Sequence, residues 1–130
     1  MEMYSNVARP LHVLLVERDE DIRSLLEMLF VGQGYTVSCA REPAEALELV
    51  KTMVPDAIFS SLVFAGMNGF ELCRHLRAMP ETATKFIVAL TGFTADGVEE
   101  TILDAGFDRY LLKPVNMLFL LSLLDTLKKP

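Results

Sequence analysis

The sequence predicts an α/β domain built on a doubly wound, parallel β-sheet with helices on both faces. Short apolar runs alternate with amphipathic segments along the chain, and this alternation is typical of strand–helix repeats whose strands are buried on both faces. The chain has 130 residues, of which 52% are hydrophobic, enough for one domain with a substantial core. Right-handed crossovers between consecutive parallel strands favour the doubly wound arrangement.

The first strand is predicted at residues 11–16, which are almost entirely apolar, as expected of a central strand. Asp19 follows as a helix N-cap, with two acidic residues in the first turn. Gly32 and Gly34 are predicted to end this helix. Its apolar residues recur at helical spacing, at Ile22, Leu25, Leu26 and Leu29.

The second strand is predicted at residues 36–39, where polar and apolar residues alternate as they do near a sheet edge. Pro43 suits the start of the next helix, residues 57–59 form the third strand, and Gly66 and Gly69 bracket a loop. The remaining elements are a helix bearing Phe70, Cys73 and Leu76, a strand at 86–90, a helix bearing Val98, Ile102 and Ala105, a strand at 110–112, and a last helix bearing Leu120, Leu123, Leu124 and Leu127.

The charge and composition disfavour several classes of function. A net charge of −6 without a basic patch disfavours direct binding to nucleic acid. No stretch is long and apolar enough to span a bilayer, and residues 1–9 are too short and polar for a signal peptide, so a cytoplasmic protein that does not bind membranes is expected. Cys39 and Cys73 form no metal or redox motif, which favours two reduced, buried thiols.

Four segments carry the motifs that are most informative about function: residues 13–17, 55–69, 89–92 and 110–114. Together they resemble the receiver domain of bacterial two-component response regulators. The resemblance covers residues 11–128 as one receiver domain, preceded by an N-terminal extension at residues 1–10. It implies a flavodoxin-like, five-stranded sheet of order 2-1-3-4-5 and a role in phosphorelay signal transduction.

The resemblance implies a site where the strands end. In the family, an acidic pair after the first strand and an aspartate ending the third strand hold Mg2+, and that aspartate accepts a phosphoryl group from a histidine kinase. Glu17 matches the first acid, but Arg18 stands where the second acid belongs and Ser61 stands at the phosphoacceptor position. Thr91 and Lys113 match the hydroxyl residue and the lysine that end the fourth and fifth strands. The chain therefore resembles a degenerate receiver, or pseudo-receiver.

Two neighbouring positions bear on the same resemblance. The loop after the acceptor usually reads proline-glycine in the family, whereas here it reads Ala65-Gly66. The proline after the family's lysine commonly follows a cis peptide bond, and we expect the same of Lys113-Pro114 because X-Pro bonds have only a small trans preference.

These substitutions are expected to change the chemistry of the site. In the family pattern, three carboxylates and one lysine leave two net negative charges, whereas Glu17, Arg18 and Lys113 leave one net positive charge. Mg2+ prefers carboxylate and water ligands. We therefore expect no cofactor, with Mg2+ binding lost or weak, and an anion between Arg18 and Lys113 instead.

Two functions remain open. The preferred one is a receiver that is not an enzyme, is not phosphorylated, and signals by binding a histidine kinase or another signalling protein. The alternative is a phosphoryl-accepting receiver with unusual ligands. A nucleophilic serine needs an activating base, and the candidate beside Ser61 is Glu17, expected to be paired with a cation. Asp56 lies five residues before Ser61, so it is expected near the opposite end of the strand and cannot replace the acceptor.

Thr91 and Tyr110 are the predicted switch residues. In receivers the phosphoryl group draws the hydroxyl inward and the aromatic ring follows, which is a two-state element biased by a local charge. Tyr110 is equally consistent with an ordinary strand aromatic that covers the sheet.

The last helix carries more apolar residues than burial of one face requires. This predicts a partner surface, or a homodimer contact, because receivers often dimerise or dock effectors through the face made by their fourth helix, fifth strand and fifth helix. The alternative is a terminal helix that simply packs more fully. The residues concerned are Met117, Leu118, Phe119 and Leu121.

Overall fold

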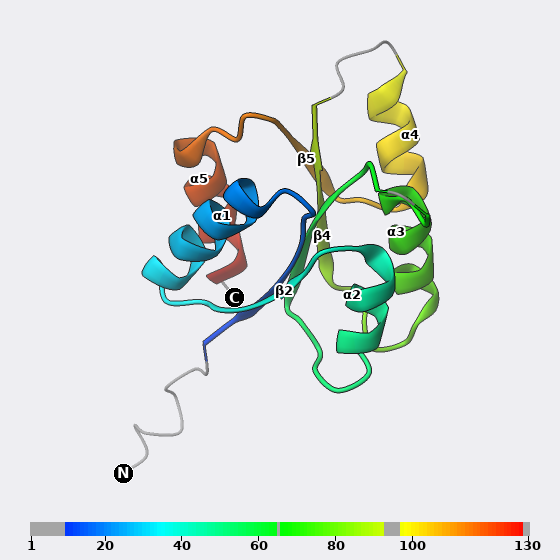
Figure 1. Cartoon of the computed structure of the whole chain (residues 1–130), viewed down its shortest axis with the longest axis horizontal. Helices are drawn as coiled ribbons and strands as arrows, with labels where there is room; N and C mark the ends of the chain where they lie inside the picture. Colours follow the sequence, from blue (N-terminus) through cyan, green and yellow to red (C-terminus); the bar gives the residue numbers. More distant parts are fainter. Residues whose placement is uncertain (1–9, 65, 93–96, 129–130) are drawn as a thin grey trace.

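Five parallel strands form one sheet in the order β2-β1-β3-β4-β5, which confirms the predicted doubly wound fold. The coordinates are those of a computed structural model that describes residues 10–64, 66–92 and 97–128 (Figure 1). Most of the predicted N-terminal extension and Ala65 lie outside the described residues. The elements are β1 (His12–Val16), α1 (Glu20–Gly32), β2 (Thr36–Ala40), α2 (Pro43–Leu49), β3 (Ala57–Ser61), α3 (Gly69–Ala78), β4 (Phe86–Thr91), α4 (Val98–Ala105), β5 (Arg109–Leu112) and α5 (Met117–Lys128).

The helices cover both faces of the sheet. α1 and α5 pack on one face, and α2, α3 and α4 pack on the other (Figure 1). Because alternate residues of a strand point to opposite faces, Val13 and Leu15 belong to the core under α1 and α5, whereas Leu14 and Val16 belong to the other core. All four side chains are fully buried, as expected of a parallel strand covered on both sides.

Helix α1 begins as the sequence predicts. The Asp19 carboxylate accepts a hydrogen bond of 3.0 Å from the Ile22 amide, which satisfies one of the free N–H groups of the first turn. The helix runs through Gly32, and Gly34 follows it with a φ of 93°, a left-handed conformation that glycine adopts without strain. The N-cap at Asp19 fixes the direction in which the chain passes from β1 to α1, and therefore the position of the residues between them.

The start of α3 packs closely against the end of β3. Asn68 and Glu71 form a capping box, in which the Asn68 side chain accepts from the Glu71 amide at 2.9 Å and the Glu71 carboxylate accepts from the Asn68 amide at 3.2 Å. A Cβ atom added to Gly69 would overlap the carbonyl oxygen of Ser61. The close approach of α3 to the end of β3 therefore requires glycine at this position.

Backbone hydrogen bonds also hold the segments that follow β1 and β5. The Glu17 amide donates to the Ala40 carbonyl at 3.0 Å, and the Lys113 amide donates to the Thr91 carbonyl at 2.8 Å. The Lys113-Pro114 peptide bond is cis, as predicted. The backbone of Glu17 and of Lys113 is therefore hydrogen-bonded to a neighbouring strand. Within the described residues, no helix has the length and apolarity needed to cross a bilayer.

Candidate functional site

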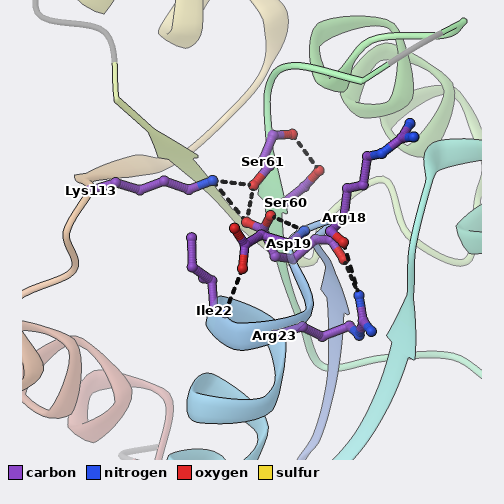
Figure 2. Close-up of polar contacts among 8 residues, drawn as sticks. Arg18, Asp19, Ile22, Arg23, Ser60, Ser61 and Lys113 are labelled. Atoms are coloured by element: carbon purple, nitrogen blue, oxygen red, sulfur yellow. Dashed lines mark hydrogen bonds and ion pairs between the residues drawn. The ribbon is translucent and has the colours of Figure 1, made fainter.

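Three polar side chains meet at the carboxyl edge of the sheet. Glu17 follows β1, Ser61 ends β3 and Lys113 follows β5. The Lys113 ammonium lies 2.8 Å from Glu17 Oε1 and donates to Ser61 Oγ, also at 2.8 Å, while the Ser61 hydroxyl donates to Glu17 Oε1 (Figure 2). We call Glu17, Ser61 and Lys113 the strand-end triad. It links three strands that are far apart in the sequence.

The carboxylate of Glu17 has partners on both oxygens. Oε1 takes the Ser61 hydroxyl and the Lys113 ammonium, and Oε2 accepts from the Asp19 amide at 2.9 Å. Glu17 and Ser61 are each only 3% exposed, and a buried carboxylate is tolerated only when it is paired and hydrogen-bonded. The expectation that Glu17 is paired with a cation agrees with this geometry, and the cation is Lys113.

The arginine at the second acidic position stays outside the triad. Arg18 is exposed, and its side chain extends away from Lys113 (Figure 2). Arg23 of α1 donates instead to the backbone, to the Glu17 carbonyl at 3.0 Å and the Arg18 carbonyl at 3.2 Å. The two cations expected to hold an anion between them, Arg18 and Lys113, therefore do not converge in this conformation.

Two other polar residues, Ser60 of β3 and Asp56 just before β3, make hydrogen bonds with backbone groups and not with the triad side chains. Ser60 is buried and donates its hydroxyl to the Ser61 carbonyl at 2.8 Å. Asp56 precedes β3 and accepts from the His12 amide at 2.7 Å, at the start of β1. Asp56 therefore lies at the end of the sheet opposite Ser61, as its position in the sequence predicts.

The predicted switch residues lie on the last two strands. Thr91 ends β4 and is 2% exposed. Tyr110 lies on β5 and donates its hydroxyl to Glu99 Oε1 of α4 at 3.1 Å. That hydrogen bond and the negative charge of the Glu99 carboxylate raise the pKa of Tyr110 above its ordinary value. The contact with Glu99 gives Tyr110 a specific partner that sequence reasoning did not identify.

The apolar residues at the start of α5 divide between surface and core. Leu118 is 79% exposed and Phe119 is 56% exposed, whereas Met117 and Leu121 are half-buried. Leu121 packs against the core under α1 and α5. Phe119 also lines a cavity of about 580 Å³ between α4, β5 and α5. The predicted partner surface is therefore accessible chiefly at Leu118 and Phe119.

The two thiols are poorly suited to chemistry. Cys73 is buried and Cys39 is half-buried, and both are unpaired thiols. Burial is the main cause that raises the pKa of each thiol to about 11. The reactive thiolate is therefore scarce near neutral pH. Cys73 is buried as predicted, whereas the prediction of a buried Cys39 is wrong, because Cys39 lies on β2 at the sheet edge and is half-buried.

The donor set at the triad does not fit the Mg2+ ion that the family resemblance implies. Magnesium needs near-octahedral oxygen ligation, commonly from carboxylates and waters. This edge offers one buried carboxylate, on Glu17, and Lys113, Ser61 and the Asp19 amide already occupy its oxygens. Among the described residues, no group of three or more histidine, cysteine or acidic side chains is placed to hold a metal.

Comparison with known proteins agrees with the fold and the motifs. The chain matches the response regulator receiver domain family over residues 13–125. It is 34% identical over 113 residues to an uncharacterised 14.6 kDa protein of Leptolyngbya boryana, covering 87% of this chain and 86% of that protein. It is 34% identical to the transcriptional regulatory protein AfsQ1 of Streptomyces coelicolor, covering 79% of this chain but only 44% of that regulator.

Solved structures show the same similarity. A putative response regulator from Chloroflexus aurantiacus superimposes with a TM-score of 0.85 at 30% identity, covering 91% of this chain and 97% of that one. The chemotaxis protein CheY4 of Vibrio cholerae also gives a TM-score of 0.85, at 27% identity over 91% of this chain and 98% of that one. With a family match that spans nearly the whole length and the same strand order, this chain belongs to the response regulator receiver domain family.

Proposed function

We propose that this receiver domain signals by binding other proteins and does not accept a phosphoryl group. The observation that carries the proposal is the strand-end triad, in which the carboxylate expected to bind a metal is paired with Lys113 and the acceptor position holds a hydroxyl. The proposed partner is a histidine kinase or another signalling protein. Direct binding to nucleic acid is not part of the proposal, because the chain carries a net charge of −6.

The physical reason is electrostatic. A phosphoryl group arriving at this edge needs cations that offset the charge on its equatorial oxygens, and the family supplies a metal for that purpose. Here the Lys113 ammonium lies against Glu17, and the exposed Arg18 side chain points away from it. Recruiting Lys113 to a phosphoryl group would leave the buried Glu17 carboxylate without its cation, which is costly.

One observation favours the alternative of a phosphorylated Ser61. Its hydroxyl donates to Glu17 Oε1, which is the arrangement of a serine beside a general base. In that reaction Ser61 Oγ would attack phosphorus, the bond from phosphorus to the donor would break, and Glu17 would take the hydroxyl proton. Against this, Ser61 is 3% exposed and the Glu17 carboxylate is already paired with Lys113, so the nucleophile is poorly accessible and its candidate base is already engaged.

The test is an NMR titration of the domain with Mg2+ and then with beryllofluoride, a phosphoryl mimic. Amide resonances of Glu17, Ser61, Thr91 and Lys113 are followed, and the proposal expects no saturable shift at any of them. A double variant, Arg18→Asp with Ser61→Asp, provides the positive control because it restores two missing carboxylates. That variant is expected to show saturable shifts with Mg2+.

A second measurement separates the two candidate functions. The domain is incubated with acetyl phosphate or phosphoramidate, and its intact mass is determined. The proposal expects an unchanged mass for the native sequence. A mass gain of one phosphoryl group that disappears in Ser61→Ala would establish the phosphorylated serine and overturn the proposal.

A further inference from the structure

We infer that Ser38 is a nucleophilic serine activated by His12, and that it accepts acyl groups from small, activated esters. His12 is the first residue of β1, and Ser38 lies on β2, the edge strand that α1 and α2 flank on opposite faces (Figure 1). The pair lies toward the amino end of β1, whereas the strand-end triad lies past its carboxyl end. This activity would be additional to the proposed function and does not depend on it.

The serine hydroxyl and the imidazole are within hydrogen-bonding distance. His12 Nε2 lies 2.8 Å from Ser38 Oγ, which is the separation required between a nucleophile and its general base. His12 pairs with Thr36 across the ladder between β1 and β2, and Ser38 is two residues farther along β2. Because alternate residues of a strand point to the same face, all three side chains lie on the face of the sheet that α2 covers.

Thr36 orients the imidazole ring. Its Oγ1 atom lies 2.9 Å from His12 Nδ1, and its hydroxyl donates to the Leu11 carbonyl at 3.5 Å. With the threonine proton directed to that carbonyl, Oγ1 is left to accept, and this pattern assigns the imidazole proton to Nδ1. Nε2 is then the nitrogen that accepts the Ser38 hydroxyl and takes its proton. A nucleophile, a base and a group that orients the base are together the elements of an activated serine.

The backbone of His12 is held by Asp56. The His12 amide donates to Asp56 Oδ2 at 2.7 Å, and the Asp56 amide donates to the His12 carbonyl, also at 2.7 Å. These two bonds tie the start of β1 to the segment before β3, while the imidazole ring reaches over β2. Since both the backbone and the ring of His12 have fixed partners, the base keeps its position beside the Ser38 hydroxyl.

The open edge of β2 provides a hydrogen-bond donor beside the nucleophile. The Thr36 amide and the Ala40 carbonyl both bond toward β1. Because backbone groups alternate in direction along a strand, the Cys39 amide points to the open edge of the sheet. Cys39 directly follows Ser38, so an ester carbonyl attacked at this edge would accept from that amide as its oxygen becomes negative.

The proposed reaction balances without a cofactor. Ser38 Oγ attacks the acyl carbon and forms a carbon–oxygen bond, and His12 Nε2 takes the hydroxyl proton. The bond from the acyl carbon to the leaving oxygen then breaks, and the imidazolium returns the proton to that oxygen. The products are an ester on Ser38 and a free alcohol or phenol. An activated leaving group is required, because a single amide at an open edge stabilises less charge than an enclosed oxyanion hole.

The test is incubation of the domain with p-nitrophenyl acetate. The native domain is expected to release p-nitrophenol and to gain one acetyl group in its intact mass, located at Ser38 by peptide mapping. Ser38→Ala and His12→Gln should each lower the rate of acetylation at least about tenfold, since a positioned general base contributes that much or more. Thr36→Val should lower the rate several-fold and Thr36→Ser should restore it, as expected of a positioning residue.

The chain offers matched controls for both proposed catalytic residues. His75→Gln removes the other histidine, which is exposed on α3, and Ser24→Ala removes an exposed serine on α1. Both variants should keep the native rate. Ser38→Cys keeps a nucleophile of similar size and should be acetylated at sulfur, so the role of this position stays testable where Ser38→Ala fails to fold.

Three outcomes would overturn the inference. They are acetylation confined to lysine side chains, an acetyl group mapped to a serine other than Ser38, and a rate that is unchanged in His12→Gln. None of them bears on phosphorylation at Ser61, which is measured separately by the mass gain with acetyl phosphate or phosphoramidate.

Discussion

Replacing Lys113 with methionine removes the ammonium that faces Glu17 but keeps a long, flexible side chain. The Nζ and Oε1 atoms are 2.8 Å apart, which corresponds to a gross attraction of about 6 kcal/mol at an effective dielectric constant near 20. Desolvation of Glu17, which is 3% exposed, offsets much of this attraction. Removing one partner of a buried ion pair costs about 3–5 kcal/mol. The Lys113 side chain is 26% exposed and therefore partly screened, so we expect a loss of about 2–3 kcal/mol in unfolding free energy.

Urea denaturation measures this loss. With a slope of about 1–3 kcal/mol per molar for a small domain, the midpoint should fall by about 0.7–3 M in Lys113→Met. The double variant Glu17→Gln with Lys113→Met leaves no buried charge without a partner, and its unfolding free energy should lie within about 1 kcal/mol of the native value.

Either of two results would contradict this role of the Glu17–Lys113 ion pair. A loss below about 0.5 kcal/mol in Lys113→Met would show that the ion pair contributes little, as exposed pairs do. A double variant whose loss equals the sum of the two single losses would show that Glu17 and Lys113 do not interact energetically.

Three further predictions follow from the same geometry. Gly69→Ala should lower the unfolding free energy by about 2–4 kcal/mol, because its Cβ overlaps the Ser61 carbonyl; a thermal melt with a loss under about 0.5 kcal/mol would contradict this. Millimolar Mg2+ should leave the melting temperature of the native sequence unchanged and raise that of Arg18→Asp with Ser61→Asp, since only bound ligand stabilises the folded state. The thiols of Cys39 and Cys73 have a raised pKa of about 11 against an ordinary value of 9.0, so their contribution to stability is complete below pH 9 and is lost as the pH rises toward 11. Replacing both with serine should flatten that part of the stability–pH curve, and an unchanged slope would assign it to other groups.

The fold and the positions of the triad residues were predictable because they depend on backbone periodicity. Residues 13–16 and 57–59 are continuous apolar runs of the kind that central parallel strands require. Once these are strands, parallel order places Glu17, Ser61 and Lys113 at one edge of the sheet. The cis bond at Lys113-Pro114 was also predictable, though from the family resemblance and not from the residues alone.

The side-chain pairing within the site was less predictable, because it depends on rotamers and burial that a sequence does not specify. Counting charges predicted two cations, Arg18 and Lys113, gathered around an anion. In the structure Lys113 reaches the buried Glu17, where pairing is most favourable, and Arg18 lies in solvent, where an unpaired guanidinium costs little. A charge count treats Arg18 and Lys113 alike, whereas in the structure only Lys113 lies beside a buried carboxylate.

The α4–β5–α5 face was expected from the family resemblance as a partner surface, but the residues that line its cavity of about 580 Å³ were not. Its lining comes from α4, β5 and α5, and no single stretch of sequence shows Glu99 beside Tyr110 or Leu103 across from Phe119. The acidic residues of α4 read as an ordinary solvated helix face when considered alone. An available signal was Leu103, which departs from the core stripe formed by Ile102 and Ala105 and proves to be 47% exposed.

The strand-end triad has a consequence for how such a domain can switch. A ligand shifts a conformational equilibrium only by the difference in its affinity for the two states, and in a phosphorylated receiver that difference comes from new charge at the acceptor. On the proposed function, Ser61 gains no charge and Glu17 keeps Lys113 as its partner. The bias on Thr91 and Tyr110 must then come from a partner protein, and the hydrogen bond from Tyr110 to Glu99 is a contact through which such a bias would act. On the proposed function, partner binding is therefore the input of this receiver as well as its output.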